Sequence, residues 1–431
     1  MKRLLFFILL YPTLHASLTA QTVDKATLDD CYTWASSNYP VAKQRGLIKQ
    51  NTALSINTLE KNLLPQIELN AQGSYQSEVT TFSLDIPGVK GPTPLSKDQY
   101  KATLDVKQVI WDGGVIAMQK KVLGAGEQVE TQRIEVEIAK LKERVNALYF
   151  NILQADANAE ILQSLKKDLA TRKIKAEAAV LNGVALKRDV QTLQVEDLKA
   201  DQKLTELKSA KAAAIRVLSL LTGKSLVENT IFERPSLRGT KQEGDDIGLQ
   251  IDRPELRLFD LQKSLIDKQI KVYSLKNFPR IMAFGTAGYG RPGLNFLKNE
   301  FRPYALAGVM FKWNLTDFYS KTLNNDLQQI RNNAQVIDIQ RDVFLLNTKS
   351  VMEQQSAEIT KWQSLIETDR QIVSLREKIK ASATAQVENG TLTTNDYLIE
   401  LNAESQARLN LALHELQLLL AQINLKTTVT N

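Results

Sequence analysis

The chain has 431 residues, 43% of them hydrophobic and 24% charged, and a formal net charge of +7. Its single Cys (Cys31) excludes an intrachain disulfide, and with only His15 and His414 beside it there is no Cys/His metal cluster. The positive charge is dilute and mixed with acidic residues, which argues against nucleic-acid binding.

Residues 1–20 have the pattern of a secretory signal. A basic start precedes an apolar core, Leu4–Leu10, and small residues follow at Ser17–Ala20, after which we expect cleavage. The core is too short to cross a bilayer, and no later stretch approaches the roughly twenty apolar residues of a transmembrane helix. Any part of the mature chain that crosses a membrane is therefore expected to be β-structure.

Cys31 follows the acidic residues Asp29 and Asp30, at the start of a short amphipathic segment. It could be a lipid-modified cysteine or a buried residue of a helix. Because the residues before it are acidic rather than small, the buried helix cysteine is the favoured interpretation.

Two parts of the chain resemble each other. The segment Asn38–Gln76 is similar to Ile251–Gly290, with matching residues at one fixed offset, and Leu181–Gln194 is similar to Glu388–Leu401. Self-similarity of this kind predicts two equivalent structural units. We assign residues 21–221 to a first repeat, 222–253 to an equatorial linker, 254–426 to a second repeat and 427–431 to a C-terminal tail. Each repeat would run helix, strand, strand, long helix, tight turn, long helix.

The strands are predicted from a period of two. Apolar and polar residues alternate along Ile67–Tyr75 and along Tyr100–Val109, whereas the second pair, about 280–289 and 304–313, is more uniformly apolar. These lengths suit a tilted crossing of a bilayer. The Pro- and Gly-rich connections Leu84–Leu95 and Gly290–Pro303 are expected to be exposed loops.

Four strands cannot close a barrel, and an open sheet edge in lipid leaves backbone groups without partners. Two copies of the chain would give eight strands and a filled interior, whereas three would give twelve and room for a channel. The alternation directs a set of polar residues away from lipid, which favours three copies and a wet lumen. These lumen candidates are Glu68, Asn70, Gln72, Lys101, Thr103, Asp105 and Lys107.

Long helices follow each strand pair. Val115–Asn182 has no Pro, and its only glycines are Gly124 and Gly126; Ser320–Val387 has neither Pro nor Gly. Apolar residues recur at alternating steps of four and three, as in a coiled coil. Helices of this length would reach on the order of 100 Å, with hairpin turns near residues 183 and 390.

Together these motifs resemble the TolC family of outer-membrane efflux channels. The resemblance rests on Leu28–Pro40, Leu63–Tyr75, Val106–Gly114 and the Asn-Gly turns at Gly183 and Gly390, and it covers nearly the whole mature chain. The resemblance implies a mixed α/β membrane protein that forms a trimer. The three chains would share a twelve-stranded β-barrel in outer-membrane lipid, and this barrel would continue into a periplasmic α-helical coiled-coil barrel. The second half departs from the pattern, because Asn314–Ser320 replaces the WDGG of the first half.

The resemblance also implies partners and a role. The chain would be the outer-membrane exit duct of a tripartite efflux or type I secretion system, docking to a periplasmic adaptor (membrane fusion) protein and an inner-membrane transporter. Most of the chain would lie in the periplasm. The implied adaptor contacts are the hairpin tips, Asn182, Gly183, Asn389 and Gly390.

Acidic residues just past the turns would ring the periplasmic aperture in this family, and the matching positions are Asp189 and Asp396. Three converging carboxylates would attract cations. The same residues also suit the first turn of a helix, where the helix dipole stabilises an acid and Thr393 offers an N-cap. Both interpretations stay open.

An enzyme is not expected, because the chain has no Gly-rich phosphate loop, its carboxylates are dispersed and His414 is expected on a helix surface. No cofactor or metal is expected either. The alternative is a periplasmic coiled-coil scaffold or adaptor without a pore, but such a protein would lack two equivalent strand pairs of membrane-crossing length.

Overall fold

The computed structural model describes residues 24–81, 94–236 and 251–430. The predicted signal (residues 1–20), most of the loop Leu84–Leu95, residues 237–250 of the linker and Asn431 lie outside these ranges. Of the helices within them, none is long and apolar enough to span a membrane.

The described residues fall into two compact units. A helical-hairpin unit lies within Met1–Ala42, Ile138–Ile251 and Ser350–Asn431, and a sheet unit comprises Lys43–Glu137 and Asp252–Lys349. Each unit takes pieces from both halves of the sequence, so the compact units cut across the two predicted repeats.

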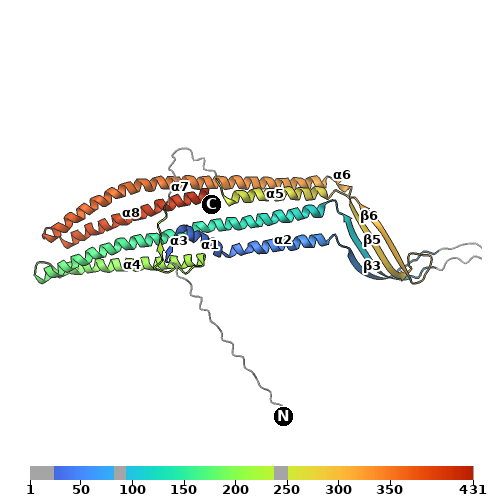
Figure 1. Ribbon diagram of the computed structural model, residues 1–431, viewed down its shortest axis with the longest axis horizontal. Helices are drawn as coiled ribbons and strands as arrows, with labels where there is room; N and C mark the ends of the chain where they lie inside the picture. Colours follow the sequence, from blue (N-terminus) through green and yellow to red (C-terminus); the bar gives the residue numbers. More distant parts are fainter. Residues whose placement is uncertain (1–23, 82–93, 237–250, 431) are drawn as a thin grey trace, which may run out of the picture. The chain divides into compact units, whose positions relative to one another are not determined.

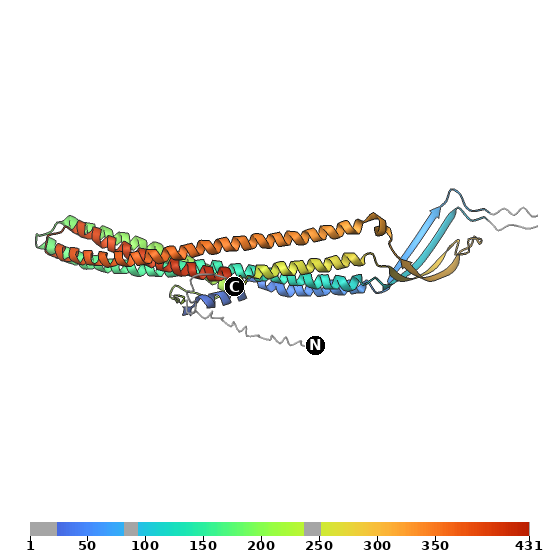
Figure 2. The same ribbon diagram turned by 90° about the horizontal axis from the view of Figure 1, so that it is seen from above.

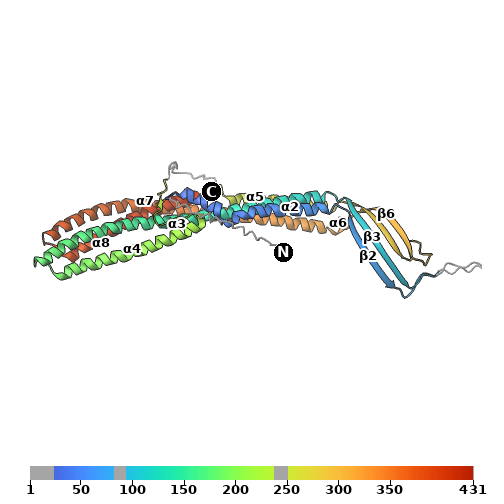
Figure 3. The same cartoon turned by 60° about the horizontal axis from the view of Figure 1, so that its bottom comes forward.

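The sheet unit is built on four antiparallel strands in the order β2-β3-β5-β6 (Figure 3). Their bounds are Gln66–Tyr75, Asp98–Trp111, Arg280–Arg291 and Arg302–Lys312. All four predicted strands therefore exist, but β3 is longer at both ends and β6 ends before Trp313. Pairing of β3 with β5 joins the two strand hairpins into one sheet.

The chain leaves the two hairpins by different routes. After β3, Gly113 and Gly114 take φ values of 74° and 82°, and the Asp112 carboxylate accepts the Ile116 N–H at 2.5 Å as α3 begins. After β6 a short helix, α6 (Thr316–Ser320), intervenes, and Lys321 has a φ of 54°. A non-glycine residue in this left-handed region is uncommon. The second half therefore makes the turn from strand to helix with a short helix and Lys321 in place of two glycines.

Besides the short α6, four longer helical segments belong to the sheet unit: α2 (Gln44–Lys61), α5 (Pro254–Leu275) and the sheet-proximal parts of α3 and α7 (Figure 1). Polar contacts join them, including Arg45–Glu135 at 2.5 Å and Lys263–Asp338 at 2.7 Å. Helix α2 buries none of its residues in the single chain.

Two helical hairpins make up most of the other unit. The first is α3 (Val115–Leu181) with α4 (Lys187–Thr222), and the second is α7 (Thr322–Glu388) with α8 (Thr394–Val429). Helices α3 and α7 have 67 residues each, and α4 and α8 have 36 each. The hairpins lie side by side in both Figure 1 and Figure 2, and an apolar cluster joins them close to their turns.

In a second apolar cluster, the N-terminal segment packs against α3, α4 and α8. It includes α1 (Leu28–Asn38), whose N-cap Thr27 and Asp30 form a capping box. Strands β1 (Lys25–Ala26) and β4 (Ile231–Phe232) pair in parallel beside it. The Tyr149 hydroxyl, on a fully buried side chain, lies 2.9 Å from the Ala26 carbonyl and 2.6 Å from that of Glu233, so it connects β1 and the residue after β4 to α3.

Two sequence predictions concern this cluster. Cys31 is completely buried, as the helix interpretation predicted, and burial raises the pKa of its thiol to about 12. The separate tail predicted for residues 427–431 is wrong for its first part, because α8 continues to Val429.

Candidate functional site

The two faces of the four-stranded sheet differ in chemistry. Residues directly opposite each other on neighbouring strands share a face, so the register assigns every strand residue to one side. We call one side the polar face: alternate residues from Gln66 to Ser74, Gln99 to Val109, Arg280 to Gly290 and Arg302 to Lys312. It contains all seven lumen candidates, Glu68, Asn70, Gln72, Lys101, Thr103, Asp105 and Lys107.

Asp105 is the centre of hydrogen bonding on the polar face. Its carboxylate accepts from Asn70 at 2.9 Å, from Thr103 at 2.8 Å and from the Thr286 hydroxyl at 2.5 Å. These donors come from β2, β3 and β5, so one carboxylate connects three strands. Lys107 lies 3.6 Å from Glu68 on the same face.

The opposite side, which we call the apolar face, presents small and aliphatic side chains. Its central rows carry no charged residue in any of the four strands described; Asp98 and Arg291 form an ion pair at one end. Several large members are exposed in the single chain, among them Leu69 at 79% and Val309 at 68%. The rows consist of Ile67, Leu69, Ala71, Ala102, Leu104, Val106, Ala283, Ala287, Ala305, Ala307 and Val309.

The second strand hairpin gives the polar face a feature that the sequence prediction missed. Phe284 lies directly opposite Gly308, and a Cβ atom at Gly308 would come within 2.8 Å of the Phe284 ring. Tyr304 covers Gly288 in the same way. Both rings therefore occupy the space beside a glycine, which explains why side chains are missing at these two positions.

The turns of the two helical hairpins have the same geometry. The Gly183 N–H donates to Val180 at 3.0 Å and the Val184 N–H to Ala179 at 2.9 Å. This pattern, with φ of 72° at Gly183, is a Schellman motif. Gly390, with φ of 71°, and Thr391 repeat both bonds to Val387 and Gln386. Asn182 and Asn389 directly precede these glycines, so the left-handed turns predicted at both positions are confirmed.

Asp189 and Asp396 both act as helix-start residues. The Asp189 carboxylate accepts the Leu186 N–H at 3.2 Å, and the Asp396 carboxylate accepts the Thr393 hydroxyl at 2.7 Å. The capping interpretation therefore has direct geometric support in each case. Asp189 also lines a cleft of about 650 Å³ between the two turns, which includes Gly390 but not Asp396.

Basic residues of α3 link the first hairpin to the second near these turns. Arg172 donates to the Val387 carbonyl at 3.3 Å, and Lys175 forms an ion pair with Glu388. The hydrogen bond from Lys175 lowers the pKa of the Glu388 carboxyl. The sequence prediction named none of these residues, because no local pattern reveals pairs 213 residues apart.

A charge network around one buried glutamate lies farther along the hairpins. Glu404 is only 3% exposed and pairs with Arg408 and, at 3.5 Å, with Lys380, which also contacts Asp168 at 2.6 Å. Burial alone would lower the pKa of Lys380, but the hydrogen bond to Asp168 and the charge of Glu404 outweigh it and raise that pKa.

His414 was expected on a helix surface, and this prediction is wrong. Its Nδ1 atom lies 2.5 Å from the Asp369 carboxylate, and its ring packs on Trp362 with the centroids 5.1 Å apart. Its side chain is 19% exposed.

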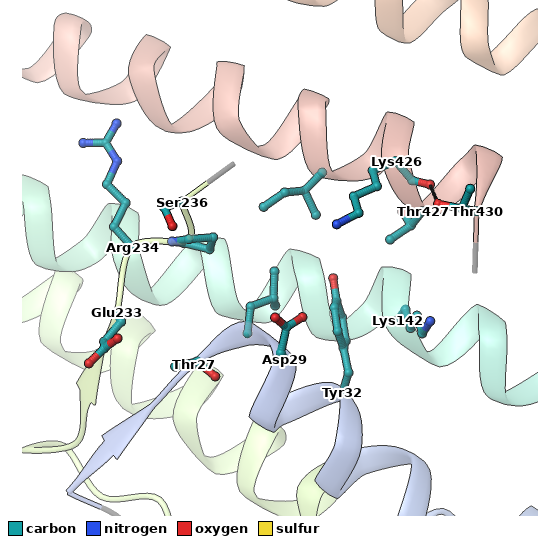
Figure 4. A pocket seen from close by; sticks show the side chains of 13 residues that line it. Thr27, Asp29, Tyr32, Lys142, Glu233, Arg234, Ser236, Lys426, Thr427 and Thr430 are labelled. Atoms are coloured by element: carbon teal, nitrogen blue, oxygen red, sulfur yellow. Dashed lines mark hydrogen bonds between the residues drawn. The ribbon is translucent and has the colours of Figure 1, made fainter. Parts of the chain in front are cut away.

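A pocket of about 460 Å³ lies between the start of α1, the segment after β4 and the end of α8 (Figure 4). Its lining mixes acids with bases, including Asp29, Glu233, Arg234 and Lys426. This mixture favours no single ligand charge. Within the three described ranges, no group of three or more His, Cys, Asp and Glu residues is placed to hold a metal ion.

No family model matches the sequence, and no curated protein matches it. Solved structures do match the fold. The outer-membrane channel OprN is 14% identical, with a TM-score of 0.68 over 93% of this chain and 89% of that one. The outer membrane protein VceC from Vibrio cholerae is 14% identical, with a TM-score of 0.65 over 94% and 96%.

The open state of the MtrE outer membrane channel from Neisseria gonorrhoeae is also 14% identical, with a TM-score of 0.65 over 93% of this chain and 88% of that one. The chain therefore has the fold of outer-membrane factor channels, as its resemblance to the TolC family predicted.

Proposed function

We propose that the chain is one subunit of a trimeric outer-membrane channel, which forms a passive exit duct for substrates. The observation that carries this proposal is the four-stranded sheet, which has a polar face and an apolar face whose central rows carry no charge. In a bilayer the first face would meet lipid and the second a wet lumen. The outer strands β2 and β6 have no second neighbour among the described strands. Three sheets would give each edge a partner and close twelve strands.

Exposed apolar residues on the helices support the same assembly. In α7, Val336, Ile339, Val343 and Leu346 follow steps of three and four residues and are 50–65% exposed. Such a stripe is the usual seam between packed helices. Copies of the chain lying side by side would cover it, and the helices would then continue the barrel as a periplasmic tunnel.

We further infer that the chain consists of two equivalent halves, with residues 21–221 and 254–426 joined by the linker 222–253. The equal lengths of α3 and α7 and of α4 and α8 support this view, as do the two matching Schellman turns. The hairpin tips would be the contact with a periplasmic adaptor, and an inner-membrane transporter of an efflux or type I secretion system would supply the cargo. Asp189 and Asp396 would border the aperture while capping their helices.

Catalysis has no part in this proposal. A pore-free periplasmic scaffold is not favoured, because it would leave the apolar face of the sheet without a covering.

The experiment is to reconstitute the purified protein in planar bilayers and record the current. We expect discrete, ohmic conductance steps, and extraction from cells only by detergent. Release by osmotic shock together with the absence of conductance would refute the channel and favour the scaffold.

A further inference from the structure

The polar face carries an excess of positive charge. Its five basic residues are Lys101, Lys107, Arg280, Arg302 and Lys312, and its two acidic residues are Glu68 and Asp105. The net charge of this face is therefore +3 per chain.

The basic residues are not evenly balanced by acids. Lys107 pairs with Glu68 at 3.6 Å and Arg302 with Glu300 at 2.9 Å, but Lys101, Arg280 and Lys312 form no ion pair with any described residue. All three are exposed. Three cations per chain are thus available to a molecule passing along this face.

Arg280 and Lys312 lie directly opposite each other at the helix end of the sheet. Like charges in this arrangement destabilise a strand pair, so fold stability does not account for them. In three copies, six cationic groups would surround the lumen at this level. Lys101 occupies a row at the other end of the face, across from Gln72 and Gly290.

An apolar patch lies beside these cations on the same face. Met282 is directly opposite Met310, Phe284 covers Gly308, and Leu306 is half exposed. Thioether and aromatic groups make favourable contacts with aromatic molecules. The first strand hairpin offers only polar side chains at the equivalent positions, so the apolar patch belongs to the second hairpin alone.

We propose that the strand section of the channel favours organic anions that carry an aromatic or other apolar part. This inference rests on the proposed channel and on the polar face as its lumen wall. The unpaired cations would attract the anionic group, because like charges around a narrow wet passage raise the local concentration of the opposite ion. The patch of Met282, Phe284, Leu306 and Met310 would contact the apolar part.

The test uses reconstituted trimers that carry Asp189→Asn and Asp396→Asn, so that acids at the hairpin turns do not set the ion preference. Reversal potentials in a KCl gradient report the preference for chloride over potassium. Block by pyrene-1,3,6,8-tetrasulfonate probes an aromatic anion, and block by inositol hexakisphosphate probes an anion without an apolar part.

We expect chloride preference and block by both anions. The double variant Arg280→Gln/Lys312→Gln should weaken both blocks about tenfold or more, while Lys49→Gln, which removes an exposed charge on α2, should change neither. Lys101→Gln provides an independent variant at the other end of the face. The double variant Met282→Gln/Met310→Gln should weaken only the block by the aromatic anion.

The outcomes separate this inference from the channel itself. An absence of conductance in the parent protein would refute the proposed function. A conducting trimer that prefers potassium, or whose block is unchanged in both the Arg280→Gln/Lys312→Gln and Lys101→Gln variants, would overturn the inference and leave the channel intact. Equal weakening of both blocks in the methionine variant would exclude the apolar part of the substrate class.

Discussion

The assignment of the two sheet faces can be tested at two neighbouring residues of β3. Leu104 lies at the middle of the strand on the apolar face, opposite Leu69 and Ala287. Thr103 precedes it on the polar face and lies opposite Asn70. Replacing each with Lys introduces the same charge at nearly the same depth but on opposite sides of the sheet.

The expected costs differ severalfold. A lysine on the lipid face near mid-bilayer costs about 2–4 kcal/mol, so three copies of Leu104→Lys would destabilise a trimer by about 6–12 kcal/mol. Thr103→Lys loses the hydrogen bond of 2.8 Å to Asp105, worth about 1 kcal/mol. The new ammonium group can in turn pair with that carboxylate, which would offset part of the loss.

The assay is urea unfolding of the protein folded into lipid vesicles, followed by tryptophan fluorescence, to which Trp111 at the end of β3 and Trp313 just after β6 contribute. We expect a large drop in the unfolding midpoint, or failed assembly, for Leu104→Lys and a small change for Thr103→Lys. Equal losses in the two variants, or a larger loss for Thr103→Lys, would show that the faces have been assigned the wrong way round.

Three further predictions follow from the helical-hairpin unit. If Asp396 and Asp189 border the aperture, the double variant Asp396→Asn/Asp189→Asn should show a lower cation preference and weaker block by multivalent cations in single-channel recordings. Unchanged currents, with a loss of a few tenths of a kcal/mol in the free energy of unfolding, would mean that these acids only cap their helices. Tyr149→Phe removes the hydroxyl that joins Ala26 to Glu233 and should cost about 1–2 kcal/mol in thermal unfolding, whereas Tyr319→Phe, at a 77% exposed residue, should cost almost nothing. Folding raises the pKa of the Cys31 thiol from 9.0 to about 12. The unfolded chain therefore loses the thiol proton at a lower pH than the folded protein, so the free energy of unfolding should fall as the pH rises from 9 to 12. Iodoacetamide should label the thiol at pH 8 only after denaturation.

Local patterns predicted much of this structure. The alternation in Ile67–Tyr75 predicted a strand and also which residues share a face, because a period of two fixes both. The Asn-Gly pairs at Gly183 and Gly390 predicted left-handed turns, since glycine adopts positive φ without steric cost. Both features depend on residues that are close together in the sequence.

Contacts between distant segments could not be read in the same way. The strands β5 and β6 have largely apolar central residues on both sides, so only their register shows that Phe284 shares a face with Asp105 and covers Gly308. The prediction for His414 failed for a related reason. Its helix pattern gave no sign that Asp369 and Trp362, on another helix, would cover it.

The mass of the detergent-extracted complex tests the central claim most directly. A sheet of four strands with two open edges predicts three chains in the complex, because twelve strands close around a passage. Native mass spectrometry after removal of the detergent should therefore give a single species of three times the mass of the mature chain. A stable monomer, or a dimer whose eight strands would leave an interior filled by side chains, would contradict the account.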